Sequence, residues 1–167
     1  VMGDYNNDQI DDVAFAGDLV GNLWRFDLSN ADPSKWSVSL LFQPAATSTS
    51  TTPGPGDQPI TVMPRLFADP TSSYFSVVFG PGNYLGASDN VGNATSKVQS
   101  VYGIRDPGPG ATTTITGRAT LVAQTLQESS KVRAVSTNPV PATNAQGEAI
   151  NGWYLDLNIS DGTKQTN

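Results

Sequence analysis

The chain contains no cysteine and no histidine among its 167 residues. Without cysteine it forms no disulfide and offers no thiolate as a nucleophile or metal ligand. The lack of both residues also excludes the usual zinc sites, Ser-His-Asp triads and Cys-His dyads. Catalysis would have to rely on carboxylates, lysine or a bound cofactor. The composition therefore predicts that the protein is not an enzyme.

Charged residues are scarce, at 14% of the chain, and acidic residues outnumber basic ones by 15 to 9. The net charge of −6 argues against nucleic acid and anionic membranes as partners, because both attract basic surfaces. It suits a cation such as calcium. No segment approaches the roughly 20 consecutive apolar residues needed to span a bilayer. A start at Val1, with no visible signal peptide, leads us to expect excision from a longer, exported chain.

Short runs rich in β-branched and aromatic residues recur along the chain, each bounded by Gly, Pro, Asn or Asp. This texture is typical of β-strands. Only Ala119–Ser130 competes as a helix, and its Thr and Val residues favour a strand. The expected strands are Val13–Gly17, Asn22–Leu28, Trp36–Phe42, Ile60–Phe67, Tyr74–Gly80, Val98–Arg105, Arg118–Leu126, Val132–Ser136 and Trp153–Leu157. The sequence thus predicts an all-β fold.

An internal repeat indicates how the strands are grouped. The pair Ala14–Gly17 and Leu23–Asp27 resembles the pair Val77–Gly80 and Val101–Asp106. In each pair an apolar strand ends at Gly, and a second strand carries an aromatic residue and closes on Asp. The apolar strands expected next are Trp36–Phe42 and Arg118–Leu126. Repeated units of three or four antiparallel strands are typical of propeller blades.

At about 40–50 residues per blade, the chain is predicted to be a partial β-propeller of about three to four blades. It would form a single domain, or a fragment of one, over residues 1–167. Two long loops, together rich in Thr, Pro, Gly and Asn, interrupt it at Gln43–Gln58 and Gly82–Lys97. Because open strand edges invite pairing, we expect at least one edge to pair with the rest of a longer chain. An identical neighbour in a homo-oligomer or filament is the alternative partner.

The sharpest local signal is the nine-residue loop Asp4–Asp12. Oxygen-bearing side chains occupy its positions 1, 3, 5 and 9, and position 7 of such loops contributes a backbone carbonyl. Calcium takes six to eight oxygen ligands, whereas magnesium prefers to keep several waters. The pattern therefore predicts a calcium site, and the alternative is a solvated turn that binds no metal. The predicted ligands are Asp4, Asn6, Asp8, the carbonyl of Ile10, and Asp12.

Two residues set this loop apart from related sites. An EF-hand needs a bidentate Glu at its twelfth position, and that position is Phe15 here. The site is instead expected to lead directly into the strand that starts at Val13. Position 6 usually carries Gly for a sharp turn, and here it is Gln9.

The segment Gly17–Leu28 resembles the signature strand pair of the PilC/PilY family, the β-propeller domain of type IV pilus-tip adhesins. Four further segments agree with that family in the same order. They are Gln58–Thr61 with Pro64, Phe79–Leu85, Gln99–Asp106 and Gly152–Leu157. The family's calcium loop precedes the first segment, as Asp4–Asp12 does here. The resemblance spans nearly the whole chain.

This resemblance implies a calcium-binding adhesin domain that is exported to the bacterial cell surface, pilus or extracellular space. It further implies roles in type IV pilus biogenesis, adhesion and twitching motility, with pilus subunits or the rest of a longer adhesin chain as partners. The metal ligands that it implies are the five already given. Two features depart from the family. Pro81 stands where Thr is usual, and Asn158–Thr163 replaces a Gly-Glu-Arg turn.

Two other functions compete with this one. A calcium-stiffened structural subunit of an extracellular filament would need the same loop. A quinone-dependent dehydrogenase is the other, because its blade repeat resembles the run from Gly17 to Trp24, but the chain is too short for a complete ring. The tryptophans Trp24, Trp36 and Trp153 could alternatively form a sugar-stacking surface. We expect instead a core that buries Trp24, Phe26, Phe79, Tyr102 and Trp153.

Overall fold

Strands account for nearly all regular structure in the computed structural model, which describes residues 1–49, 52–82, 98–129, 132–157, 159–160 and 165–166. Among these residues the only helical turn is the 3-10 turn Pro33–Lys35, which starts where the Asp32 side chain accepts a hydrogen bond from the backbone N–H of Ser34. The strands are β1 (Met2–Gly3), β2 (Val13–Gly17), β3 (Leu23–Asp27), β4 (Ser37–Gln43), β5 (Arg65–Ala68), β6 (Phe75–Phe79), β7 (Ser100–Arg105), β8 (Ile115–Thr116), β9 (Val122–Gln124), β10 (Leu126–Ser129), β11 (Val132–Val135), β12 (Gly152–Asp156), β13 (Ile159–Ser160) and β14 (Gln165–Thr166). The all-β prediction is confirmed.

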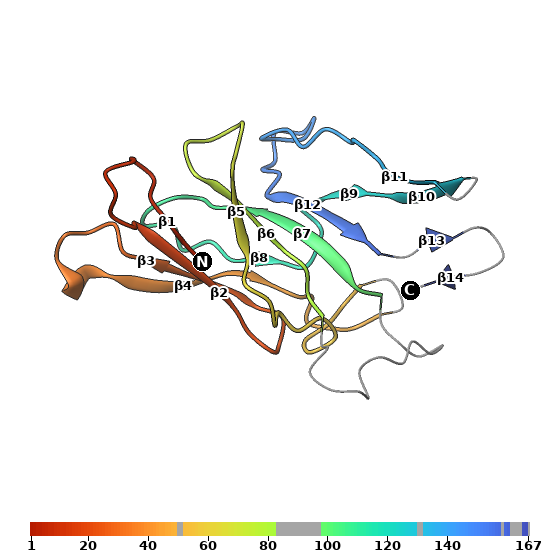
Figure 1. Ribbon diagram of the computed structural model, residues 1–167, viewed down its shortest axis with the longest axis horizontal. Coiled ribbons are helices and arrows are strands. Elements are labelled where there is room, and N and C mark those ends of the chain that lie inside the picture. The colour runs from red at the N-terminus through yellow and green to blue at the C-terminus, as the bar shows by residue number, and fades with distance from the viewer. Residues whose placement is uncertain (50–51, 83–97, 130–131, 158, 161–164, 167) are drawn as a thin grey trace.

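The strands form two five-stranded sheets and two two-stranded pairs (Figure 1). The first sheet has the order β1-β2-β3-β4-β8, and the second has the order β5-β6-β7-β12-β9. In both sheets the first four strands are antiparallel, and the fifth strand runs parallel to the fourth. Of the three to four blades expected, two are therefore five-stranded sheets, and the other strands form the β10–β11 and β13–β14 pairs.

The internal repeat of the sequence is visible in this topology. The pair β2–β3 holds the same place in the first sheet as β6–β7 holds in the second. The next strand of the second sheet is β12, however, and not the expected Arg118–Leu126. That segment begins with a turn closed by a hydrogen bond from Leu121 N–H to Arg118 C=O, and then divides into β9 and β10. The division occurs because β10 pairs with its own hairpin partner β11.

The expected strand Ile60–Phe67 is shorter than predicted, since only Arg65–Ala68 pairs as a strand after Pro64. Beyond Gly82, the expected loop Gly82–Lys97 lies outside the described residues. Of the motif Phe79–Leu85, residues 79–82 are described. The first strand pairs with β2 and the last with β13, so within the described part of the chain they do not pair with each other. The sheets are therefore open, as expected of part of a propeller.

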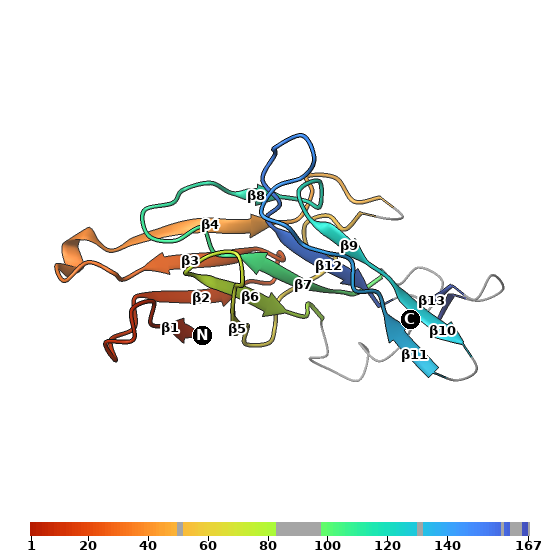
Figure 2. The same ribbon diagram turned by 90° about the horizontal axis from the view of Figure 1, so that it is seen from above.

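The hydrophobic core lies between the two sheets, which face each other as two layers (Figure 2). The ring of Phe42, on β4, lies 6.0 Å from that of Phe79 and 5.2 Å from that of Tyr102 in the second sheet. The buried hydrophobic residues in this interface include Val13, Phe15, Leu23, Phe42, Val77, Phe79, Tyr102 and Ile104. The predicted burial of Phe79 and Tyr102 is therefore confirmed.

The prediction for Phe26 is wrong, because its side chain is 37% exposed. Residues alternate between the two faces of a strand, and on β3 the inward positions are Leu23, Arg25 and Asp27. Trp24 and Phe26 therefore point outward, and Trp24 and Trp153 are each only half-buried. The tryptophans also form no common sugar-stacking surface, because Trp24 lies on the first sheet and Trp153 on the second. None of the described helical turns is long or apolar enough to cross a membrane.

Candidate metal centre

The loop Asp4–Asp12 connects β1 to β2 and is closed at its base by two hydrogen bonds. The backbone N–H of Asp12 donates to the carbonyl of Gly3 at 2.8 Å. The backbone N–H of Tyr5 donates to Asp12 Oδ2 at 2.7 Å. The first and last predicted side-chain ligands are therefore held at the same end of the loop, where the strand pair begins.

Inside the loop, the predicted ligand side chains turn back onto the backbone. Asp4 Oδ1 accepts hydrogen bonds from the N–H groups of Asn6 at 3.0 Å and Asn7 at 2.6 Å, and its Oδ2 accepts one from Gln9 at 2.8 Å. Asn6 Oδ1 accepts from Asp8 N–H at 2.8 Å, and Asp8 Oδ1 accepts from Ile10 N–H at 2.9 Å. The oxygen-bearing side chains at alternate positions of the sequence thus accept hydrogen bonds from backbone N–H groups of the same tight loop.

Two residues of the loop adopt the left-handed backbone conformation: Asn7 at φ 61° and Gln9 at φ 73°. Gln9 stands where comparable loops have Gly, and it still makes the turn. A residue with a Cβ loses roughly 1–2 kcal/mol in this conformation. The hydrogen bond from Gln9 N–H to Asp4 offsets part of that loss. The departure at position 6 therefore leaves the shape of the loop intact.

The electrostatics of the loop favour a charged Asp4. Desolvation would raise the pKa of this carboxyl, but the N–H donors of Gln9, Asn7 and Asn6 bring the pKa below its ordinary value. A carboxylate oxygen that accepts one N–H still has a lone pair for another partner. In the described residues no three acidic side chains come together as a ready cluster. The predicted set includes an amide and a backbone carbonyl besides carboxylates, and such an all-oxygen set fits calcium chemically.

Tyr5, the second residue of the loop, leaves the loop and inserts between the two sheets. Its ring stacks on Phe75 at a centroid distance of 5.5 Å and meets the ring of Tyr74 edge-on at 5.0 Å. Its hydroxyl donates to the carboxylate of Asp106 and accepts a hydrogen bond from Arg25 at 2.9 Å. Burial and the bond to Asp106 raise the pKa of Tyr5 well above its ordinary range. The loop is therefore anchored in the core through a neutral phenol.

Arg25 is the centre of a buried ionic cluster next to Tyr5. Its Nε lies 2.9 Å from Asp106 Oδ1, and its Nη1 lies 3.1 Å from Asp27 Oδ2. The side chain of Arg25 is 1% exposed and that of Asp106 is 0% exposed. Burial opposes the charge of Arg25, but the bond to Tyr5 and the charge of Asp106 hold its pKa above the ordinary value.

Sequence reasoning missed this cluster. The signal available was the repeat itself, because Asp27 and Asp106 close equivalent strands of the two copies. Both carboxylates converge on Arg25, although Asp106 lies 81 residues away from it.

The ionic cluster around Arg25 makes the free energy of unfolding depend on pH. Burial opposes ionisation of Asp27, but hydrogen bonds from Ser29, Gly110 and Arg25 lower its pKa from 3.8 to about 2. Because the folded-state pKa is the lower one, its contribution is fully present above about pH 4 and is lost as pH falls through 2. At 1.36 kcal/mol per pKa unit, that contribution is about 2 kcal/mol. Urea unfolding between pH 6 and pH 2 should therefore show a steep loss of stability.

Asp27→Asn should flatten this loss, because the substituted residue does not titrate. Asp11→Asn changes an exposed residue and serves as the control, with the wild-type pH profile expected. A profile for Asp27→Asn that keeps the wild-type slope below pH 4 would assign the pH dependence to other carboxylates.

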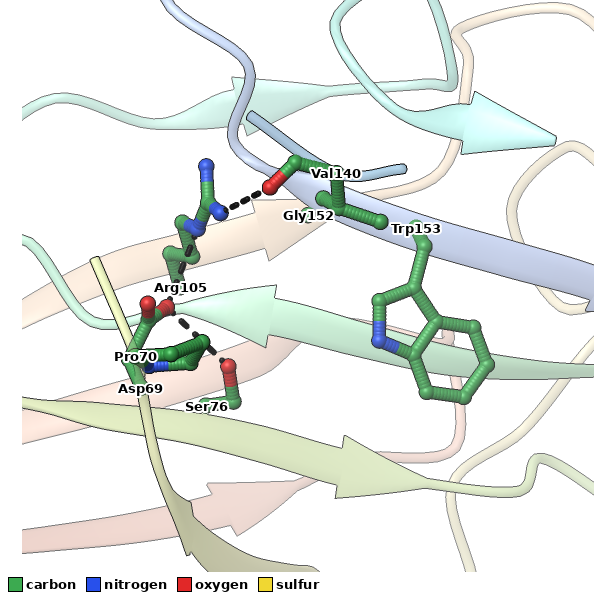
Figure 3. Close-up of a pocket in the computed structure, with 7 residues that line it drawn as sticks. All are labelled: Asp69, Pro70, Ser76, Arg105, Val140, Gly152 and Trp153. Carbon is green, nitrogen blue, oxygen red and sulfur yellow. Dashed lines mark hydrogen bonds and ion pairs between the residues drawn. The ribbon is translucent and has the colours of Figure 1, made fainter. Parts of the chain in front are cut away.

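A separate pocket of about 270 Å³ lies on the outer side of the second sheet (Figure 3). Arg105 lies at one end, 2.9 Å from Asp69 Oδ2, and Trp153 lies at the other. The remaining donors of Arg105 bind the carbonyls of Val140, Pro141 and Ile150 at 2.6 to 2.7 Å. This guanidinium therefore holds the loop before β12 in place at one end of the pocket.

Comparisons with known proteins agree with the fold. A family model described as the PilY1 beta-propeller domain matches residues 1–139. A type IV pilus biogenesis factor PilY1 homolog from Xylella fastidiosa is 33% identical, over 92% of this chain and 10% of its own. The type IV pilus biogenesis factor PilY1 of Pseudomonas aeruginosa strain PAO1 is 34% identical, over 95% of this chain and 16% of its own.

A solved structure is also similar. The crystal structure of the Pseudomonas aeruginosa PilY1 C-terminal domain matches with a TM-score of 0.75 and 34% identity, over 96% of this chain and 38% of that one. The chain thus spans 10–16% of these two curated relatives and 38% of the solved domain. The prediction of a partial β-propeller is confirmed.

Proposed function

Because the chain belongs to the PilY1 β-propeller family, we propose that it is a calcium-binding adhesin domain of a type IV pilus biogenesis factor. The observation that carries this proposal is the family match over residues 1–139. The relatives named above are type IV pilus biogenesis factors. The role is accordingly non-catalytic, and its site is the bacterial cell surface or the pilus.

The calcium part of the proposal rests on the loop Asp4–Asp12. The side chains of Asp4, Asn6, Asp8 and Asp12 and the carbonyl of Ile10 would hold the ion. Calcium would supply a divalent charge to which these oxygens can bind at once. The chain's own contribution is the preformed turn at Asn7 and Gln9, together with the anchor that Tyr5 provides in the core.

The partners that fit this proposal are pilus subunits or the rest of a longer adhesin chain. The open edges of the two sheets support such contacts, because an unpaired strand edge offers a row of backbone donors and acceptors. The alternative partner is an identical chain, which would form a homo-oligomer or filament through the same strand edges. Adhesion and twitching motility are the cellular activities in which the domain would take part.

One observation favours a second candidate, a calcium-stiffened structural module. Tyr5 connects the loop directly to the Arg25 cluster between the sheets. Calcium in the loop would therefore stiffen the interface of the two sheets. The two candidates share the metal site and differ in whether pilus activity responds to it.

Asp8→Ala should weaken calcium binding by about tenfold or more, because the affinity of such loops depends on the number of charged ligands. Calorimetric titration with calcium measures this directly. Asp11→Ala is the matched control, since Asp11 is an acidic residue of the same loop outside the predicted ligand set. Equal affinities for wild type and Asp8→Ala would indicate a solvated turn with no metal.

The same pair of variants tests the role in cells. Asp8→Ala should reduce surface pili and twitching motility at unchanged amounts of the protein, while Asp11→Ala should leave both at wild-type levels. Weaker calcium binding with normal piliation, motility and adhesion would favour the structural module.

A further inference from the structure

The loop that follows β7, Asp106–Gly110, is held by carboxylates of the buried ionic cluster. Its sequence is Asp-Pro-Gly-Pro-Gly, and proline has no backbone N–H. Gly108 and Gly110 therefore carry the only backbone donors that follow Asp106 in this loop. The N–H of Gly108 donates to Asp106 Oδ1 at 3.1 Å. The N–H of Gly110 donates to Asp27 Oδ2 at 2.8 Å. Both donors thus depend on carboxylates of the cluster.

Tyr5, a residue of the predicted metal loop, reaches the same carboxylate. One oxygen of Asp106 accepts the hydroxyl of Tyr5, while the other accepts Gly108 N–H. The ring of Tyr74 makes a second connection between the two loops. It meets the Tyr5 ring edge-on at a centroid distance of 5.0 Å. A Cβ added to Gly108 would lie 2.3 Å from the Cε2 atom of Tyr74. Tyr5 and Gly108 therefore share two neighbours.

The backbone of Tyr5 belongs to the metal loop itself. Tyr5 lies between Asp4 and Asn6, the first two predicted ligands. Its N–H donates to Asp12 Oδ2, on the last predicted ligand, at 2.7 Å. The carboxylates of the loop repel one another until a divalent cation neutralises them. Binding of calcium would therefore fix the backbone around Tyr5, and with it the direction of the Tyr5 side chain.

We propose that Tyr5 couples calcium in the loop Asp4–Asp12 to the order of the loop Asp106–Gly110. With the metal loop fixed, the Tyr5 hydroxyl would hold the Asp106 carboxylate where it accepts Gly108 N–H. Both prolines of the loop after β7 are exposed in this chain. Occupancy of the metal site would therefore be expressed at a second place on the surface. The inference rests on the proposed calcium site and adds to it an element that responds to the ion.

Coupling of this kind acts in both directions, because two linked sites change each other's affinity by the same factor. The Tyr5 hydroxyl should therefore strengthen calcium binding, although it is not a ligand. Tyr5 is in this sense a positioning residue. Tyr5→Phe removes the hydroxyl and keeps the ring that packs on Phe75 and Tyr74. It thus breaks the connection to Asp106 without emptying the core.

Hydrogen exchange of the native polypeptide that contains this chain measures the response of the loop. In calcium chloride, the N–H groups of Gly108 and Gly110 should exchange at least about fivefold more slowly than in a chelator, a coupling of ordinary size. Gly147 is the internal reference, because its N–H also closes a turn, donating to Asn144 C=O at 3.0 Å. Its exchange rate should not change. Mass spectrometry of peptides that span the two turns gives both rates.

The variant Tyr5→Phe should abolish this slowing at saturating calcium. Calorimetric titration should show an affinity for calcium about fivefold lower than that of the wild type. Tyr154→Phe is the matched control, since it removes a tyrosine hydroxyl from β12 and keeps the ring. It should retain both the affinity and the exchange response of the wild type.

The outcomes separate this inference from the calcium site on which it rests. A wild type that binds no calcium would refute both. Calcium binding with unchanged exchange at Gly108 and Gly110 would refute the coupling alone, and this comparison needs no variant to fold. A Tyr5→Phe protein with the affinity and the exchange response of the wild type would show that Tyr5 does not connect the two loops.

Discussion

Arg25→Ala should lower the free energy of unfolding by about 3–5 kcal/mol, the range found when one partner of a buried ion pair is removed. The substitution would leave Asp106, whose side chain is 0% exposed, without its cation. Asp27 and the Tyr5 hydroxyl would lose a donor at the same time. Urea unfolding followed by tryptophan fluorescence measures the loss.

The exposed pair Arg133 and Glu128 provides the matched control, with Nε and Oε2 3.0 Å apart. Arg133→Ala should cost no more than about 1 kcal/mol, as expected of a surface ion pair. The comparison separates the effect of burial from that of losing an arginine. Similar losses for the two variants would show that the Arg25 cluster is not a buried ionic network in solution.

Among the glycines that the structure describes, Gly152→Ala should be the most destabilising substitution, with a loss of at least about 3 kcal/mol from backbone strain and steric overlap combined. Gly152 has φ 138°, a conformation that side chains disfavour. A Cβ at this position would lie 2.0 Å from the carbonyl oxygen of Gly103 on the paired strand β7. Because that atom is backbone, relief would require β12 to move away from its partner.

The variant Gly147→Ala separates the cost of backbone strain from the cost of steric overlap. Gly147 also has a positive φ, 81°, but a Cβ there would meet nothing within 4 Å. Its loss should therefore be about 1–2 kcal/mol, the cost of a side chain in this backbone conformation alone. Thermal unfolding of both variants measures the difference. If Gly152→Ala unfolded no earlier than Gly147→Ala, the close approach of β12 to β7 would be wrong.

The local sequence pattern was sufficient to predict the strands whose pairing partners are close in sequence. Val13–Gly17 was predicted with its observed bounds, and the β2–β3 pair follows from the apolar runs on either side of the Asp18–Asn22 turn. The order of the second sheet could not be predicted in this way. Its strand β12 follows β7 only after four other strands, β8 to β11, and such long-range pairing leaves no local trace.

The orientation of β3 shows a second limit of pattern reasoning. Hydrophobicity alone favours Trp24 and Phe26 as the inward residues. The structure instead turns Arg25 inward, because Asp106 from the second sheet neutralises it. An ion pair between residues far apart in sequence thus outweighs the local preference.

The Asp4–Asp12 loop is the opposite case. Its turns are made by side chains that bind backbone groups two to five residues away, so its shape depends on local spacing. The calcium site expected from that spacing stays a prediction. Tyr5 was not recognised, since its partners Arg25 and Asp106 lie outside the loop. The burial of the motif residue Gln58 also depends on partners that are far away in the sequence. It is 5% exposed, and its amide bonds Ser100 and Tyr102, which lie on β7.

The segment between β7 and β12 decides when the domain can fold. It supplies β8 to the first sheet and β9 to the second before the chain returns as β12. Neither sheet is complete when its first four strands in sequence have been synthesised. Contacts between residues far apart in sequence slow folding and keep strand edges open in intermediates. We therefore expect the first sheet to be completed only after β8 has been synthesised, and the second only after β12.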